Sequence, residues 1–567
     1  MQQESPFGKN YWLALGISML ILLAWQPLLK MTGYAPAPAP PAVTQESVRE
    51  VSAGEEMPAP AKSTPALSAA EGPFLEAVKK AAVVQFRNEF YDIKFSTQGA
   101  SVVQLRYIGS DLRGNVSGAE FFDEDISKPG LFAVDLGPEA PDLSRAVYNL
   151  TRSGQNDSAL EFTYEMPSAF KVTKKFIFSA TEPVIVLDVS VTNLSNAGKS
   201  FPAAIHIGMD DRPDEEEKGM FRSFDAVFWG DGIQARPSGK IRSKGLYIVQ
   251  PLVWSGIVKK YFALLVKPDK KISAVSGEAD QASIFLRLTS EVFETVPGGT
   301  AKAGFLIYAG PQRYEALKKT GAGFEEIISL NPGLFGQFKG LVGLFKLWML
   351  QGLKFGYQFT HNFGWAIILL TLLIKGLFAP FTHMSYESMK RMQAIQPKMK
   401  SLQERYKNDV GKLHREMAQL YKRNKVNPWM GCLPMLLQMP IFIGFYFMLA
   451  DCIELKGAPF IFWIHDLSRP DHLWTLPFSL PLLGNGINLL PLLMIFSMVW
   501  QQKLTPTAAA SPEQEKIMAF MPVMMGFVFY KMPSGLVLYW LVSTLLTVIQ
   551  QVFVKRIVIV LHHEDRE

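Results

Sequence analysis

The stretch TLLIKGLFAPFT, residues 371–382, is an apolar segment with one charged side chain, that of Lys375. Apart from this lysine, residues 355–382 contain no Asp, Glu, Lys or Arg. The segment is longer than the roughly 20 mostly apolar residues that cross a bilayer as a helix. An ammonium group in the middle of such a helix costs about 2.5–3.5 kcal/mol on insertion scales. The sequence therefore predicts a membrane-spanning helix whose single lysine has a particular task.

Six apolar segments of this kind indicate a membrane protein with several spans. They lie at about residues 10–29, 355–382, 426–450, within 473–502, 517–530 and 532–554. Hydrophobic residues make up 48% of the chain and charged residues 19%, which suits a protein that is part membrane and part water-soluble. Only one basic residue precedes the first segment, and no good cleavage site follows it. We therefore expect this segment to remain as an uncleaved anchor.

The short loops set the orientation of the spans. Residues 383–426 hold eleven Lys and Arg residues against four Asp and Glu residues, a surplus of seven positive charges in a chain whose net charge is +6. By the positive-inside rule this segment is cytoplasmic. Six spans then place both termini in the cytoplasm and residues 30–330 outside it.

The sequence pattern of the basic segment predicts a helical hairpin. Apolar residues such as Met392, Ile395 and Met399 recur every three or four positions, and residues 408–411 (NDVG) interrupt the pattern. The surplus charge could contact anionic lipid, RNA or an acidic partner, or it could only fix the topology. The candidate contact residues on this hairpin are Lys398, Lys400, Arg405 and Lys407.

Between the first two spans the pattern changes to short β-branched runs separated by Gly, Asn, Asp and Pro, which predicts a large, mostly antiparallel β-sandwich. A helix is expected at 312–330. The full division, in chain order, is an anchor at 1–30, a Pro- and Ala-rich flexible linker at 31–83, the β-sandwich with its C-terminal helix at 84–330, an interfacial amphipathic helix at 331–354, the second span at 355–382, the cytoplasmic basic hairpin at 383–426, four further spans within 427–558 and a short cytoplasmic tail at 559–567.

No catalytic motif stands out. The segment NAGKS (196–200) lacks the first glycine of a phosphate-binding loop, and neither HExxH nor GxSxG occurs. The two cysteines, Cys432 and Cys452, form no CxxC signature. We therefore expect neither an enzyme nor a bound metal or cofactor.

Four motifs carry a family resemblance: TLLIKGLFAPFT, NPWMGCLPMLLQMPIFIGFYFML, APFIFWIHDLS, and KIMAFMPV followed by MPSGLVLYW. Together they resemble the YidC family of bacterial membrane-protein insertases, which are related to the Oxa and Alb proteins. The order of one anchor, a large external β-domain and five clustered spans looks like the Gram-negative form. The resemblance implies that five helices enclose a hydrophilic groove open to the cytoplasm and to lipid.

In this family a basic residue of the groove attracts the polar or acidic part of a client. By position Lys375 takes that role, although the family usually has Arg. An ammonium keeps the charge but loses the flat, bidentate fork of a guanidinium. The other residues that we assign to the groove are Thr371, Gln438, Tyr539, Trp540 and Ser543.

The implied partners are nascent membrane proteins, the Sec translocon, membrane lipids, and the ribosome and signal recognition particle receptor. The implied location is the bacterial inner membrane. The alternatives are a solute transporter and a membrane-tethered β-domain that binds or acts on carbohydrate.

Overall fold

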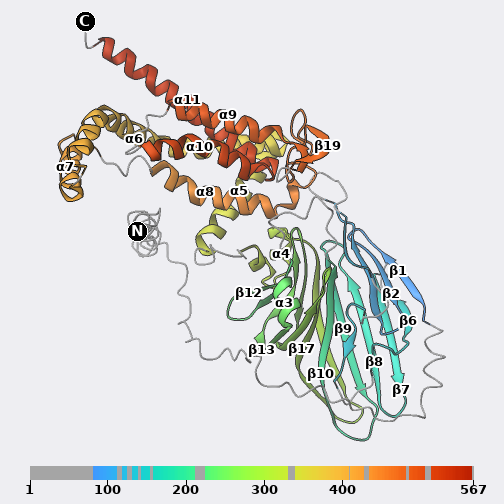
Figure 1. Ribbon diagram of the computed structural model, residues 1–567. Helices are drawn as coiled ribbons and strands as arrows, with labels where there is room; N and C mark the ends of the chain where they lie inside the picture. Colours follow the sequence, from blue (N-terminus) through green and yellow to red (C-terminus); the bar gives the residue numbers. More distant parts are fainter. Residues whose placement is uncertain are drawn as a thin grey trace. The chain divides into compact units, whose positions relative to one another are not determined.

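A computed structural model describes residues 81–110, 118–123, 130–137, 142–153, 158–210, 224–329, 339–407, 409–424, 426, 433–480, 484–504 and 512–564. These residues belong to one compact unit, Gly72–Glu567, which contains a β-domain followed by a helical part (Figure 1). The predicted anchor and nearly all of the predicted linker lie outside the described residues.

The β-domain consists of three antiparallel sheets, as the alternating sequence pattern predicts. The four-stranded sheet has the order β1 (Val83–Arg87), β2 (Tyr91–Ser96), β3 (Ser101–Tyr107), β4 (Ala119–Asp123). The five-stranded sheet has the order β13 (Leu246–Leu252), β16 (Ile272–Ala279), β17 (Ser283–Thr295), β10 (Lys199–Asp210), β5 (Val134–Asp135). The nine-stranded sheet has the order β12 (Ile233–Pro237), β11 (Phe224–Trp229), β14 (Trp254–Lys259), β15 (Phe262–Pro268), β18 (Thr300–Pro311), β9 (Val184–Asn193), β8 (Phe170–Phe178), β7 (Ala159–Met166), β6 (Asn149–Ser153). A short helix, α3 (Ser238–Lys244), separates β12 from β13.

The core of the β-domain lies between the sheets, and β8 shows how the sequence builds it. Every second residue of β8 is buried, so one face of the strand joins a shared apolar cluster. One of the buried residues is Lys174, whose Nζ donates hydrogen bonds to the carbonyl oxygens of Gly99, Ala100 and Phe132. These acceptors favour the charged form, but loss of hydration dominates and lowers the pKa of Lys174 to about 7.

The helix expected at 312–330 is only partly present. Two short helices stand there, α4 (Tyr314–Lys319) and the 3₁₀ helix η4 (Phe324–Ser329). Between them Gly321 and Gly323 have φ angles of +63° and +78°, a left-handed conformation that favours glycine and ends a helix. The helical segment expected at 312–330 is therefore divided into two short helices.

The helical part begins with two long helices, α5 (Lys339–Thr360) and α6 (Phe363–Arg405). The break between them lies inside the segment that we expected to be one span at 355–382. His361 has a φ of +52°, and the Asn362 side chain accepts hydrogen bonds from the backbone N–H groups of Gly364 and Trp365. Asn362 thus starts a new helix, and residues 355–360 belong to α5.

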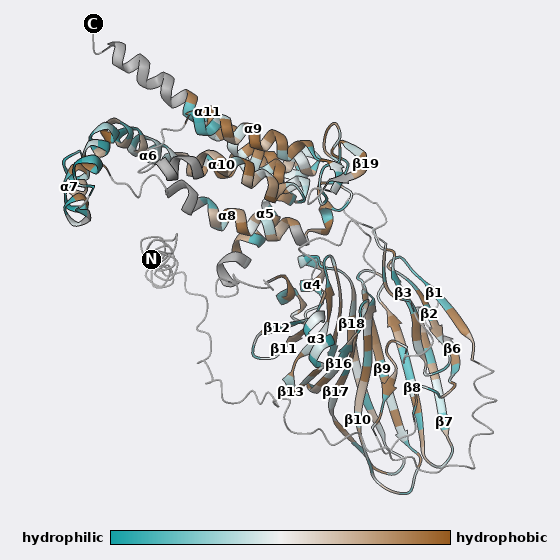
Figure 2. Ribbon diagram, in the orientation of Figure 1, coloured by the Kyte–Doolittle hydropathy of each residue, from teal (hydrophilic) through white to brown (hydrophobic). Residues whose placement is uncertain are grey.

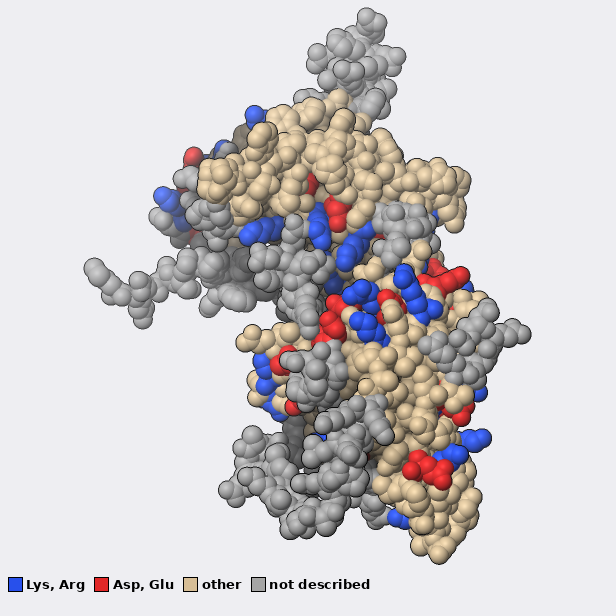
Figure 3. All heavy atoms as spheres, turned by 90° about the vertical axis from the view of Figure 1, so that its right-hand side faces the viewer, with Lys and Arg blue, Asp and Glu red and all other residues tan. Residues whose placement is uncertain are grey.

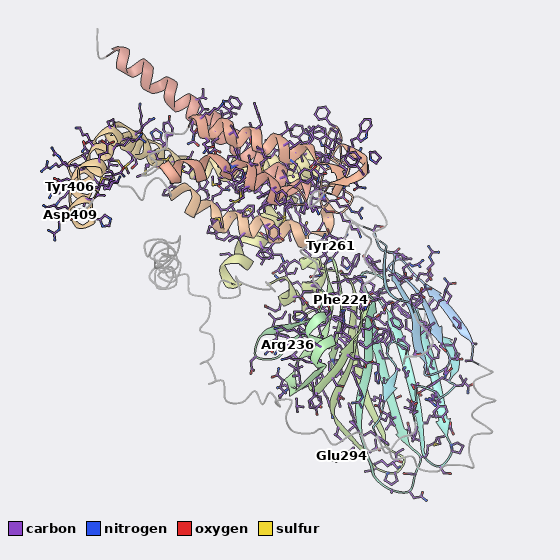
Figure 4. The ribbon with its side chains drawn as sticks, viewed as in Figure 1. Phe224, Arg236, Tyr261, Glu294, Tyr406 and Asp409 are labelled. Atoms are coloured by element: carbon purple, nitrogen blue, oxygen red, sulfur yellow. The ribbon has the colours of Figure 1, made fainter. Side chains whose placement is uncertain are left out.

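Two helices, α6 and α7 (Val410–Arg423), occupy the segment where the sequence predicts a basic hairpin. Helix α6 continues without interruption from the apolar segment through Pro380 and Pro397 to Arg405, and α7 returns beside it. The Asp409 side chain accepts a hydrogen bond from the Lys412 N–H at the start of α7, and Figure 4 marks Tyr406 and Asp409 at this turn. The second span and the first half of the hairpin are therefore one helix.

The remaining helices complete a closely packed bundle (Figure 1). They are α8 (Leu433–Asp451), the 3₁₀ helix η7 (Ile453–Leu455), α9 (Leu489–Leu504), α10 (Pro512–Phe529) and α11 (Ser534–Glu564), with the strands β19 (Trp474–Leu480) and β20 (Gly484–Ile487) as a hairpin before α9. Figure 2 shows the hydrophobic character of these helices and the hydrophilic character of the α6–α7 turn. Within the described residues, two helices are long and apolar enough to cross a membrane, Phe363–Arg405 and Ser534–Val552, and three shorter apolar helices accompany them.

Candidate functional site

One face of α11 carries a row of buried polar side chains. Tyr539, Ser543, Thr547 and Gln551 follow one another at intervals of four residues, and all four are buried. Residues four apart lie on the same side of a helix, so they form one polar stripe in an otherwise apolar helix. Such a stripe needs polar partners on the neighbouring helices.

Lys375 of α6 is one of these partners. Its Nζ donates a hydrogen bond to Thr547 Oγ1 over 3.0 Å, and the side chain is half-buried. An ammonium group has three donors, and among the described residues Thr547 is the one acceptor that it contacts. Lys375 therefore keeps hydrogen-bonding capacity for an incoming acceptor.

Thr371 lies one turn before Lys375 on the same helix and is almost completely buried. Its hydroxyl donates to the Ile367 carbonyl oxygen over 2.7 Å, a bond within its own helix. The Thr547 hydroxyl likewise donates to the Ser543 carbonyl oxygen. Both threonine hydroxyls donate within their own helices, which leaves their oxygen lone pairs as acceptors, and the Thr547 oxygen accepts from Lys375.

Gln438 of α8 contacts the same stripe at another level. Its Nε2 donates a hydrogen bond to the Tyr539 hydroxyl. The Tyr539 ring is stacked on Phe445, with 4.3 Å between ring centroids. Tyr539 and Thr547 are eight residues apart, which corresponds to about 12 Å along the helix. The structure thus joins two predicted residues, Gln438 and Tyr539, and pairs a third, Lys375, with a residue that was not predicted, Thr547.

Trp540 lies apart from this stripe. Its ring packs edge-on against Phe442 of α8 and at a tilt against Phe529 of α10, with centroid separations of 5.1 Å in both cases. Consecutive residues on a helix point about 100° apart, which explains why Trp540 does not share the direction of Tyr539. The structure therefore places Trp540 in an aromatic cluster that joins three helices.

The four basic candidate residues of the hairpin form an exposed group, and none of them makes an ion pair with another described residue. They lie at the end of α6 and in the turn that follows: Lys398, Lys400, Arg405 and Lys407. The apolar seam beneath them packs as predicted, with Met392, Ile395 and Met399 buried against Leu420 and Tyr421 of α7. This packing presents the basic side chains to solvent.

Sequence reasoning missed two members of the polar stripe, Thr547 and Gln551. The signal was present, because both continue the four-residue spacing that begins at Tyr539 and Ser543. A search along α11 for polar residues at this spacing finds the partner of Lys375. In the described part of the chain, no three His, Cys, Asp or Glu side chains come together as metal ligands.

Comparison with known proteins gives a consistent result. The family described as 60Kd inner membrane protein matches residues 355–560, and the YidC periplasmic domain matches residues 83–331. The membrane protein insertase YidC of Geobacter sulfurreducens is 34% identical over 474 residues, which are 82% of this chain and 85% of the relative. That of Syntrophus aciditrophicus is 31% identical over 566 residues, 97% of this chain and 99% of the relative.

Among solved structures, a crystal structure of an active YidC insertase is similar over 83% of this chain and 93% of the other, with a TM-score of 0.33 and 17% identity. The relatives match this chain through both the β-domain and the helical part. The chain belongs to the YidC family of membrane protein insertases.

Proposed function

We propose that this protein inserts other membrane proteins into the bacterial inner membrane and assists their folding there. Six spans place both termini in the cytoplasm and the β-domain in the periplasm. Family membership, the apolar helices and the positive surplus of residues 383–426 support this arrangement. ATP and metal have no part in the mechanism that we propose.

The observation that carries the mechanism is the half-buried ammonium of Lys375 beside the polar stripe of α11. Between α6 and α11 it forms the positive floor of a hydrophilic groove open to the cytoplasm. Two unit charges about 4 Å apart attract each other by about 4 kcal/mol at an effective dielectric constant of about 20, compared with about 1 kcal/mol in bulk water. An acidic or polar segment of a client is therefore held in the groove while its apolar segment enters the lipid.

The stripe supplies the rest of the path. The hydroxyl and amide groups of Gln438, Tyr539, Ser543 and Thr547 exchange hydrogen bonds with the client backbone, which reduces the cost of moving it through an apolar region. Trp540 contributes by holding α8, α10 and α11 together at this level. The groove thus combines one charge with a row of weak, exchangeable contacts that suit many sequences.

The exposed basic residues of the hairpin have a separate role in delivery. They contact the ribosome, the signal recognition particle receptor or the anionic lipid headgroups near the cytoplasmic mouth of the groove. Some clients reach the protein alone and others beside the Sec translocon.

The test is complementation of a bacterial strain depleted of its own insertase. We expect the full chain, and a chain lacking residues 84–310, to restore growth and insertion of a reporter membrane protein. A tethered carbohydrate-active domain would lose all activity with this deletion. Failure of both chains, with normal expression and membrane location, would refute the proposed function.

A further inference from the structure

A loop between α8 and α9, which we call the aromatic loop (the described residues 459–480 and 484–488), caps one end of the helical part. The Asn362 side chain at the start of α6 donates to the Pro459 carbonyl oxygen over 3.2 Å. The backbone N–H of Ser534 at the start of α11 donates to the Arg469 carbonyl oxygen over 2.7 Å. The loop therefore lies where α6 and α11 begin, and Figure 1 shows its strand β19 at the end of the bundle away from α7.

Buried polar groups hold this loop in one conformation. Asp471 Oδ2 accepts from the Trp463 indole N–H over 2.9 Å and from the Leu490 backbone N–H over 2.7 Å. Asn488 Nδ2 donates to the Tyr530 carbonyl oxygen over 2.6 Å, and the Tyr530 hydroxyl donates to a carbonyl oxygen of the loop. Since Asp471 and Asn488 are both buried, breaking these bonds would leave unpaired polar groups in the interior. The described part of the loop therefore has a defined conformation.

This rigid loop exposes large aromatic rings. Phe462 is 83% exposed, Trp474 70% and Phe478 59%. Phe462 also has a φ of +56°, a left-handed conformation that is costly for a bulky side chain. In water, an exposed phenylalanine in a strained conformation on a fixed loop does not stabilise the folded protein. The arrangement requires a partner that accepts apolar surface.

The surroundings identify that partner as lipid. No Asp, Glu, Lys or Arg occurs in residues 472–502. The exposed apolar surface of the loop continues along α9 through Leu492, Phe496 and Trp500. Figure 3, which views this end of the helical part, shows an uncharged surface bordered by a band of Lys, Arg, Asp and Glu side chains. Exposed aromatic rings beside an uncharged surface that has a charged border are typical of the interface of a bilayer.

Helix length points the same way. Helix α9 has 16 residues and reaches about 24 Å, whereas the hydrocarbon core of a bilayer is about 30 Å thick. The hairpin of β19 and β20 directly precedes α9 and extends the apolar surface beyond the end of this helix. The aromatic loop thus adds to the length of apolar surface that α9 alone is too short to provide across the hydrocarbon core.

We propose that the aromatic loop is an interfacial anchor, which places Phe462, Trp474 and Phe478 at the boundary between headgroups and acyl chains of the outer leaflet of a phospholipid bilayer. This inference rests on the proposed membrane arrangement. The anchor fixes the depth of α8 and α9 on the side of the membrane away from the basic hairpin. It therefore sets how far the short helices draw the two leaflets together.

The test uses the full chain in phospholipid nanodiscs, with Cys432→Ser and Cys452→Ser and one new cysteine carrying an environment-sensitive fluorophore. Trp474→Cys and Phe478→Cys report on the loop, and both side chains are exposed, so the fold should tolerate the changes. Phe496→Cys is the lipid-facing control, and Val249→Cys, on the exposed side of β13, is the water-facing control. Quenching is measured with lipids spin-labelled near the headgroup or deep in the acyl chain.

We expect the shallow quencher to reduce the fluorescence of the two loop labels more than the deep quencher does, because interfacial aromatic side chains lie at the level of the headgroups. Loop labels that behave like Val249→Cys while Phe496→Cys is quenched would overturn the anchor and leave the proposed function standing. Loop labels shielded from both lipid and aqueous iodide would assign the surface to a second copy of the chain and also overturn it. An unquenched Phe496→Cys would refute the membrane arrangement itself.

Discussion

Lys354 of α5 joins the β-domain to the helical part, and replacing it by methionine should loosen that junction. Its Nζ lies 2.8 Å from Glu315 Oε2 of α4 and 3.4 Å from Glu454 Oε1 of η7. The two carboxylates differ in environment, because Glu315 is 56% exposed and Glu454 only 5%. The methionine side chain preserves most of the packing of the lysine stem while it removes the charge.

The burial of the two partners sets the expected magnitudes. Removing one member of a buried pair leaves an uncompensated charge and costs about 3–5 kcal/mol, so Lys354→Met should destabilise the junction by this amount through Glu454. An exposed pair contributes about 0–1 kcal/mol, so Glu315→Gln should destabilise the junction by no more than about 1 kcal/mol. Lys354→Met combined with Glu454→Gln should recover most of the loss, since an uncharged amide then replaces the buried carboxylate.

The assay is native-state hydrogen exchange of the full chain in nanodiscs, which gives opening free energies for the amides of α4, η4 and α5. The opening free energy of these amides should fall strongly in Lys354→Met, little in Glu315→Gln, and partly recover in the double variant. Equal effects of the two single variants, or no recovery in the double variant, would show that buried charge at Glu454 does not hold the junction.

Three further predictions follow from the other sites. Replacing the four exposed basic residues of the hairpin by Gln should reduce the insertion of cotranslational clients most in a reporter-insertion assay. The four residues are Lys398, Lys400, Arg405 and Lys407. Unchanged insertion at normal expression would show that the hairpin acts only as a topology signal. Trp540→Ala should lower the thermal unfolding midpoint of the helical part, at a cost below the roughly 3–5 kcal/mol of a fully buried ring, because Trp540 is partly buried. Trp540→Phe should be milder, because a ring still joins the three helices, and equal midpoints would contradict this packing role. Burial lowers the pKa of Lys174 from 10.5 to about 7, so between pH 7 and pH 10.5 the unfolded chain binds more protons than the folded chain. Urea unfolding of the β-domain should therefore show stability that rises with pH across this window, and Lys174→Met should remove the rise. A flat profile in the native chain would refute the shift.

Local pattern predicted much of the fold and failed where a cap or a turn decides the outcome. The alternation in β8 and the apolar spacing of the hairpin each follow from one periodicity, and both appear in the structure. The break at residues 361–362 was missed because hydropathy averages over a window, whereas Asn362 acts as a helix cap through one side chain. The glycines at 321 and 323 divided the expected helix in a similar way.

The candidate site was predictable as a set of residues but not as an arrangement. Lys375 stands out because it is the one charge in its segment. Its hydrogen bond to Thr547 joins residues from α6 and α11 that are far apart in the sequence, and no local signal states this pairing. The same holds for the contact of Gln438 with Tyr539 and for the aromatic cluster around Trp540.

The charge of Lys375 is the centre of the proposed mechanism, and one measurement tests it most directly. Insertion is followed in a depleted strain for pairs of clients that differ only in Asp or Glu residues of the translocated tail. Lys375→Arg should insert both clients normally, since it keeps the positive charge. Lys375→Ala should fail chiefly with the acidic tail, and Lys375→Glu should be worse because it repels that tail and places an acid in a partly apolar site. Equal insertion of acidic and neutral tails by Lys375→Ala would contradict the electrostatic role of this residue.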